Sequence, residues 1–153
     1  MNIKIILSGA LAMLLSSCGD MPKDLEGGWG NDCKSPTIRL GYNAAEFRDL
    51  QFGASPMVPF EVTKQKFNGT DLRLTFLQRF PHDSQPSIPD QVEFLYHFVA
   101  STGYDTLTLV DVTITPSGNG TYNPQYFDHD HDHPNSGIGV PMKQCDHVPP
   151  PTR

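Results

Sequence analysis

The sequence predicts an all-β fold, a small antiparallel β-barrel or sandwich built from a meander of hairpins, with room for one short helix. Two observations favour this class. Runs of alternating apolar and polar residues recur along the chain, and Gly, Pro and Asn gather between the runs. One pair of runs is separated by Asn68-Gly69, a dipeptide that favours the positive φ angles of a tight hairpin turn.

The expected strands follow one another from the N-terminal third of the domain onward. They occupy residues 36–42, 58–67, 70–80, 91–100, 105–115 and 121–127. Successive side chains in a strand point to opposite faces. Four aromatic residues therefore share one face, and they are candidates to line a cavity: Phe76, Phe94, Tyr96 and Phe98.

Two segments depart from simple alternation. The apolar phase of residues 105–115 switches after Leu109, which predicts a β-bulge at Leu109–Val110. In residues 43–52, Asn43 is followed three places later by Glu46, as in a helix capping box. A short helix therefore competes with a strand in that segment.

The first residues do not belong to the β domain. Lys4 precedes an apolar run from Ile5 to Leu15, which has the length of a signal-peptide core and is short for a bilayer span. A buried first helix is the alternative. The composition indicates a leader and a polar tether up to residue 28, one β domain (29–147) and a Pro-rich tail (148–153); the division into a signal peptide (1–17) and a lipidated tether (18–28) is what the resemblance given next implies.

The apolar run ends in Leu15-Ser16-Ser17-Cys18, which resembles the lipobox of bacterial lipoproteins. The resemblance implies that Cys18 becomes the first residue of the mature chain and carries acyl chains such as palmitate. More than one chain makes such an anchor stable. Gly19, rather than Asp, follows the cysteine. By the same resemblance the protein is expected in the cell envelope, at the outer membrane more than the inner, facing the periplasm or the cell surface.

Two further cysteines, Cys33 and Cys145, lie near the two ends of the expected domain. An exported chain meets an oxidising compartment, so the pair predicts a disulfide. The alternative, a thiolate metal or redox pair, lacks Cys-x-x-Cys spacing.

The charge of the chain limits its partners. The whole sequence has a formal charge of −6, and loss of Lys4 with the leader makes it one unit more negative. No basic cluster is present to neutralise phosphates, so nucleic acid is excluded as an expected partner. The expected partners are the membrane, through the acyl chains, and an envelope protein or a divalent metal.

Gly27-Gly28-Trp29 resembles the G-x-W opening of lipocalin- and avidin-type barrels, in which the tryptophan plugs the closed end. The resemblance covers three residues. The alternative is a single Trp that anchors an N-terminal strand to any β core.

The segment FDHDHDHPNSG concentrates three His and three Asp in six residues. Imidazole nitrogens suit Zn, Cu or Ni, and carboxylates can ligate or orient them. The candidate metal residues are Asp128, His129, Asp130, His131, Asp132 and His133. Calcium is a rival ion, although Gly139 stands where an EF-hand-like loop needs Glu. The segment is also compatible with a solvated loop that binds no ligand and with a pH-sensitive loop.

The sequence contains no G-x-S-x-G, H-E-x-x-H or P-loop motif. His97 as a general base is the one catalytic alternative, and it has no evident partner in the sequence. We therefore expect no enzyme. The expected function is non-catalytic binding by an anchored envelope lipoprotein, with the His/Asp segment capturing a transition metal. The alternative is a β module that binds a small apolar molecule or a protein, without a metal.

Overall fold

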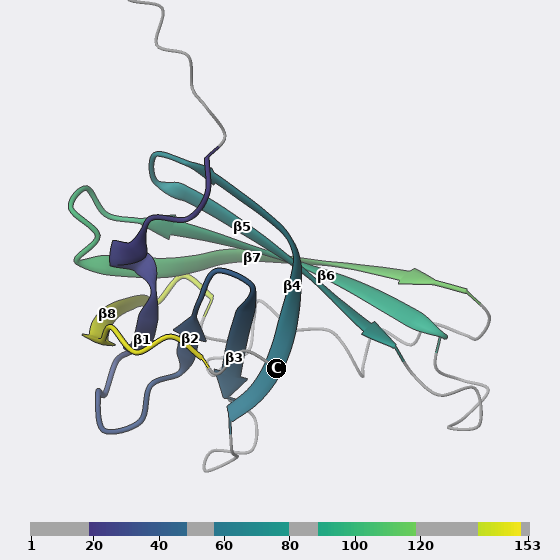
Figure 1. Ribbon diagram of the computed structural model, residues 1–153, viewed down its shortest axis with the longest axis horizontal. Coiled ribbons are helices and arrows are strands. Elements are labelled where there is room, and N and C mark those ends of the chain that lie inside the picture. Colours follow the sequence, from purple (N-terminus) through teal and green to yellow (C-terminus); the bar gives the residue numbers. More distant parts are fainter. Residues whose placement is uncertain (1–18, 49–56, 80–88, 119–137, 151–153) are drawn as a thin grey trace, which may run out of the picture.

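A computed structural model describes residues 19–48, 57–79, 89–118 and 138–150. Eight strands form a closed antiparallel barrel in which each strand pairs with its neighbours in sequence and β1 pairs with β8 (Figure 1). This confirms the predicted all-β fold and selects the barrel over the sandwich. The elements are a 3₁₀ turn η1 (Lys23–Leu25) and the strands β1 (Gly27–Gly30), β2 (Ile38–Leu40), β3 (Ala44–Arg48), β4 (Met57–Asn68), β5 (Asp71–Arg79), β6 (Gln91–Ala100), β7 (Thr106–Ser117) and β8 (Pro141–Asp146).

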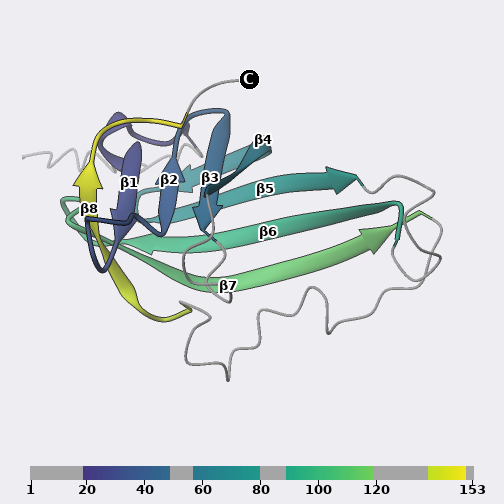
Figure 2. The ribbon, with the colours of Figure 1, turned by 90° about the horizontal axis from the view of Figure 1, so that it is seen from below.

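The strands differ greatly in length. β1, β2 and β3 have 4, 3 and 5 residues, whereas β5, β6 and β7 have 9, 10 and 12. Figures 1 and 2 show that β5, β6 and β7 continue beyond the short strands as a three-stranded sheet. The barrel is therefore closed at one end, and one of its walls extends past the other.

β4 lies between the short strands and the long strands and pairs with one of each. Its first part, Met57–Glu61, pairs with β3, and its second part, Val62–Asn68, pairs with β5. The register shifts between Val62 and Lys64, where the strand passes from one partner to the other. Such a bulge bends a strand, so β4 can pair with β3 in one wall of the barrel and with β5 in the other.

The hairpin between β4 and β5 forms as predicted, with its turn one residue later. Asn68 pairs with Asp71, so the two loop residues are Gly69 and Thr70. Gly69 has a φ of 68°, and Asn68 is not among the positive-φ residues. A positive φ at the first loop position alone is the requirement of a type II′ turn, which needs Gly only there.

The predicted bulge in β7 is confirmed. His97 of β6 pairs with Asp111 of β7, and the next residue, Phe98, pairs with Leu109. Val110 is thus the extra residue, and it is 36% exposed. Because the extra residue resets the phase, Leu107 and Leu109 point inward before it, and Val112 and Ile114 contact the core after it.

In the described part of residues 43–52, which is residues 43–48, the chain forms a strand and not a helix. β3 pairs with β2 on one side and with β4 on the other. The carbonyl of Asn43 accepts a hydrogen bond from the Val62 N–H at 3.0 Å. The capping-box pattern does not produce a helix here because both neighbours need β3 to complete their ladders.

Residues 19–28 do not form the expected tether. Gly19 exchanges two backbone hydrogen bonds with Phe67, each 3.1 Å long. The side chains of Met21 and Leu25 are 4% and 0% exposed. Burial of these two apolar side chains stabilises the packing of the segment against the barrel. At the other end of the described chain, Pro150 is buried.

The core fills the barrel from the end that η1 covers. Trp29 is completely buried, and its indole N–H donates to the Leu25 carbonyl at 3.0 Å. The described residues contain no buried side-chain polar atom without a partner. Within the same part of the chain, no helix has the length and hydrophobicity that a bilayer crossing requires. The buried apolar core residues are Met21, Leu25, Trp29, Ile38, Leu40, Ala45, Phe67, Leu72, Leu74, Phe76, Val92, Phe94, Phe98, Ala100, Leu107, Leu109 and Met142.

Candidate functional site

The two ends of the barrel are built differently. Successive connections of an up-and-down barrel alternate between its ends. One end holds the short connections 41–43, 69–70 and 101–105, and we call it the tight-turn end. The other is the end at which β1, β3, β5 and β7 stop and β2, β4, β6 and β8 begin, and we call it the long-loop end because longer stretches of sequence separate the strands there. Long connections carried by a rigid scaffold are the usual place for binding residues.

An aromatic cluster fills the barrel interior toward the long-loop end. It consists of Phe47, Phe60, Phe76, Tyr96 and Phe98. Phe47 is central, with its ring centroid 4.6 Å from that of Tyr96 and 5.2 Å from that of Phe76. The Phe47–Phe76 and Phe76–Tyr96 contacts are edge-to-face, the arrangement that aromatic quadrupoles favour.

Burial within and around this cluster differs from strand to strand. The β5 and β6 side is buried up to Val92 and Phe94, which are 0% and 8% exposed. Phe76 and Phe98 are 1% and 0% exposed. Phe47 and Phe60, which lie nearer the loops that follow β3 and precede β4, are only partly buried. The same holds for Val112 and Ile114 on β7, past the bulge. The long-loop end therefore presents partly exposed apolar surface, whereas the tight-turn end is sealed by η1 and Trp29.

Tyr96 supplies the polar group of the cluster. Burial raises the pKa of its phenol well above the usual range, because the ionised form would lose its hydration. The hydroxyl therefore stays protonated at any physiological pH. A neutral hydroxyl amid apolar rings is typical of sites that bind apolar molecules and orient them by a single polar contact.

The sequence identified part of this cluster. Phe76, Phe94, Tyr96 and Phe98 lie on the inner face of β5 and β6, as predicted from alternation. Phe47 and Phe60 were missed. Phe47 lies in the segment where helix and strand competed, so its face was not assigned, and Phe60 lies in the part of β4 that pairs with β3.

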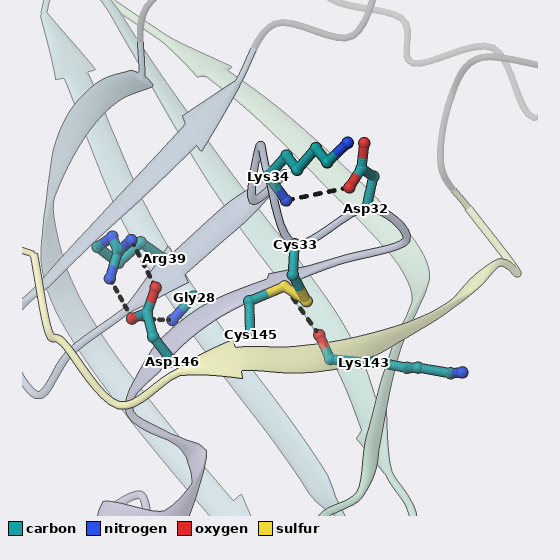
Figure 3. The surroundings of a disulfide bond; sticks show 8 residues. All are labelled: Gly28, Asp32, Cys33, Lys34, Arg39, Lys143, Cys145 and Asp146. Atoms are coloured by element: carbon teal, nitrogen blue, oxygen red, sulfur yellow. Dashed lines mark hydrogen bonds and ion pairs between the residues drawn. A yellow bond between two sulfur atoms is a disulfide. The ribbon is translucent and has the colours of Figure 1, made fainter.

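The two cysteines of the domain are joined as predicted. Cys33 and Cys145 form a disulfide across a sequence separation of 112 residues, with their Cα atoms 4.9 Å apart (Figure 3). The bond ties the loop after β1 to β8, on the outside of the seam where the barrel closes. It therefore holds the seam and has no redox partner in the described residues.

An ion pair lies beside the disulfide at the same seam (Figure 3). The Arg39 guanidinium on β2 contacts both carboxylate oxygens of Asp146, at 2.5 and 3.0 Å. The Val148 and Gly28 N–H groups also donate to Asp146. The hydrogen bond from Arg39 is the main reason that the pKa of Asp146 lies below its usual range. The contact links β2, β1 and the end of β8.

The remaining predicted residues have simpler placements. His97 lies on the outer face, where its Nε2 is 2.8 Å from the Asp71 carboxylate. Among the described residues it has no second hydrogen-bond partner, so the structure lends it no catalytic arrangement. Cys18 and the residues Asp128, His129, Asp130, His131, Asp132 and His133 lie outside the described residues. In the described ranges, no three His, Cys, Asp or Glu side chains are grouped as metal ligands would be.

The chain matches no known protein family, no curated protein and no solved structure.

Proposed function

We propose that this protein is a membrane-anchored, non-catalytic binding protein of the bacterial cell envelope, acylated at Cys18, whose barrel takes its ligand at the long-loop end. The observation that carries the proposal is the partly exposed apolar surface on β3, β4 and β7 at the long-loop end. The side chains of Phe47, Phe60 and Ile114 are only partly buried there, although Val92 and Phe94 of β6 are buried.

A small apolar molecule is the ligand class that this end fits. Aromatic and aliphatic side chains supply apolar contact area there. An acidic chain with a charge of −6 has little to attract an anionic ligand. We therefore favour a neutral or cationic apolar molecule.

The test uses the folded protein and a neutral apolar dye whose fluorescence rises in apolar surroundings. We expect saturable binding to the wild type. Ile114→Ala and Phe47→Ala should each weaken it by about tenfold, which corresponds to about 1.4 kcal/mol of lost contact. Val110→Ala is the matched control, since Val110 is exposed at the bulge.

Cooperative unfolding of each variant must be checked first, because partly unfolded proteins also bind such dyes. Ile114→Ala removes less volume than Phe47→Ala and keeps the test valid if the latter does not fold. Unchanged affinity in a folded Ile114→Ala and a folded Phe47→Ala would contradict the apolar site.

Metal capture is the second candidate, and a specific observation favours it. Three His and three Asp stand together within residues 128–133. In the sequence that segment lies between β7 and β8, and its placement is outside the described residues. In this proposal His129 and His131 are the primary ligands, His133 is the third, and Asp130 or a water is the fourth.

Calorimetric titration with zinc, copper and nickel separates the two candidates. The triple variant His129→Ala, His131→Ala and His133→Ala should lose most of the binding heat while keeping dye binding unchanged. Equal heats in the wild type and the triple variant would remove the metal proposal. Heat with calcium alone would move the site to carboxylate ligation by Asp128, Asp130 and Asp132.

A further inference from the structure

The N-terminal segment of the described chain is held at the tight-turn end. Gly19 N–H donates to the Phe67 carbonyl and Phe67 N–H donates to the Gly19 carbonyl, both at 3.1 Å. Phe67 is separated from the Gly69-Thr70 turn by a single residue. The first described residue is therefore fixed beside the hairpin turn of β4 and β5.

The residues that follow are fixed as well. Met21 is 4% exposed and Leu25 is 0% exposed, and the Leu25 carbonyl accepts the indole hydrogen bond of Trp29. In the amide orientation that satisfies both neighbours, Gln65 accepts from the Met21 N–H at 2.5 Å and donates to the Tyr42 carbonyl at 3.0 Å. No flexible spacer separates Gly19 from the barrel.

We infer that the tight-turn end of the barrel lies against the phospholipid surface and that the long-loop end faces away from it. This inference rests on the proposed acylation of Cys18. Cys18 directly precedes Gly19, so its Cα is about 3.8 Å from that of Gly19. Acyl chains buried in the bilayer then bring the Gly19–Phe67 pair to headgroup level.

The tight-turn end has a surface suited to that position. Its connections expose small polar residues and Tyr42, which is 50% exposed at the turn between β2 and β3. A tyrosine suits the boundary between water and lipid, because its ring is apolar and its hydroxyl is polar. Exposed lysines at this end are opposed by exposed aspartates, so charge does not hold this surface to anionic lipid. These residues are Lys23, Lys66, Asp20, Asp24 and Asp105.

The orientation decides where a ligand arrives. β7 has 12 residues and runs from the tight-turn end toward the long-loop end. A strand of that length spans about 36 Å at the usual rise, which exceeds half the thickness of a bilayer. The partly exposed aromatic cluster would therefore meet ligands in the aqueous phase, and not those within the bilayer.

The test places one fluorophore at each end of β7. Thr102→Cys lies in the turn before β7, and Ser117→Cys is the last residue of β7; both positions are exposed small hydroxyl residues. Each acylated full-length variant is labelled and reconstituted in phosphatidylethanolamine–phosphatidylglycerol vesicles that contain a headgroup-nitroxide lipid. We expect the nitroxide to quench the label at position 102 several-fold more than the label at position 117.

A second variant tests the cause. A flexible Gly/Ser insert between Cys18 and Gly19 should reduce the difference in quenching to near zero, because the anchor is then no longer fixed to the barrel. Equal quenching at the two positions without the insert, or stronger quenching at position 117, would overturn the inference. So would a difference that the insert leaves unchanged.

Mass spectrometry of the mature N-terminus separates this inference from the proposal beneath it. A chain without acyl groups at Cys18 would overturn the proposed anchoring and the inference together. An acylated chain with the wrong quenching pattern would overturn the orientation alone.

Discussion

At the scale of single residues, the barrel seam depends on two adjacent glycines. Gly27 has a φ of 119°, and a Cβ there would lie 1.9 Å from the Asp146 carbonyl oxygen. At Gly28 a Cβ would lie 3.0 Å from the Asp146 carboxylate and 3.2 Å from Pro36. The glycines let β1 approach the end of β8 closely enough for Arg39 to reach Asp146.

Gly27→Ala should therefore destabilise the barrel strongly, by about 3 kcal/mol or more, since backbone strain and a backbone clash act together. Gly69→Ala is the matched control. Gly69 also has a positive φ, 68°, but nothing lies within 4 Å of a Cβ built there. Its cost should be about 1 kcal/mol. Urea unfolding measures the free energy of unfolding of both variants. Equal losses of stability would contradict the requirement for glycine at the β1–β8 seam.

The Arg39–Asp146 pair should make stability depend on pH in the acid range. Because the folded-state pKa of Asp146 is lowered, the pair stabilises the fold at pH values above the ordinary Asp pKa. This contribution is lost as pH falls below about 4 toward the lowered pKa. Asp146→Asn should cost about 1 kcal/mol at pH 7, because the carboxylate is partly exposed, and less at pH 3.

Urea unfolding of the wild type and Asp146→Asn at the two pH values checks this. The two curves should converge as the pH falls. A constant difference between them would show that the lost hydrogen bonds, and not the charge, account for the cost.

At the scale of elements, the sequence predicted the features that follow from the alternation of apolar and polar residues along a strand. The hairpin of β4 and β5, the long strands β6 and β7, and the bulge at Val110 follow from which residues are apolar. Three features were beyond that reasoning; two depend on contacts distant in sequence, and the position of the turn depends on local backbone geometry. The helix signal at Asn43 yields to pairing on both sides of β3, the turn moves to Gly69-Thr70, and residues 19–28 pack on the barrel.

The bulge in β7 should be indispensable. Deleting Val110 would put Leu107 and Leu109 out of phase with Val112 and Ile114, so one pair would face solvent. Each exposed side chain would cost about 1.5–3 kcal/mol. We expect the deletion to abolish cooperative thermal unfolding followed by circular dichroism. Val110→Thr keeps the number of residues in β7 and should unfold like the wild type. Cooperative thermal unfolding of the deletion variant would contradict the register described here.

At the scale of the whole molecule, closure joins the first and last strands. β1 and β8 are short, and two covalent or ionic links reinforce their seam, the Cys33–Cys145 disulfide and the Arg39–Asp146 pair. The sequence predicted the first link from compartment and cysteine count. It could not predict the second, because nothing local in sequence relates residue 39 to residue 146.

Removing the disulfide by Cys33→Ser with Cys145→Ser should lower the free energy of unfolding by about 3–5 kcal/mol, because it frees a loop of more than a hundred residues in the unfolded chain. Urea unfolding with and without reductant measures the change. Reductant should shift the wild type toward the double variant and leave the double variant unchanged. An unshifted wild type in fully reducing conditions would contradict a stabilising role.

The burial of Pro150 against Gly41 has a practical consequence. Gly41 lies in a tight turn, and a Cβ there would be 2.8 Å from the Pro150 ring. The described chain thus leaves the barrel near the same end at which Gly19 enters it. A fluorescent protein fused downstream of Pro150 would crowd the end that we infer to lie against the lipid, so a label at Ser117, at the opposite end of the barrel, is the better choice for experiments in whole cells.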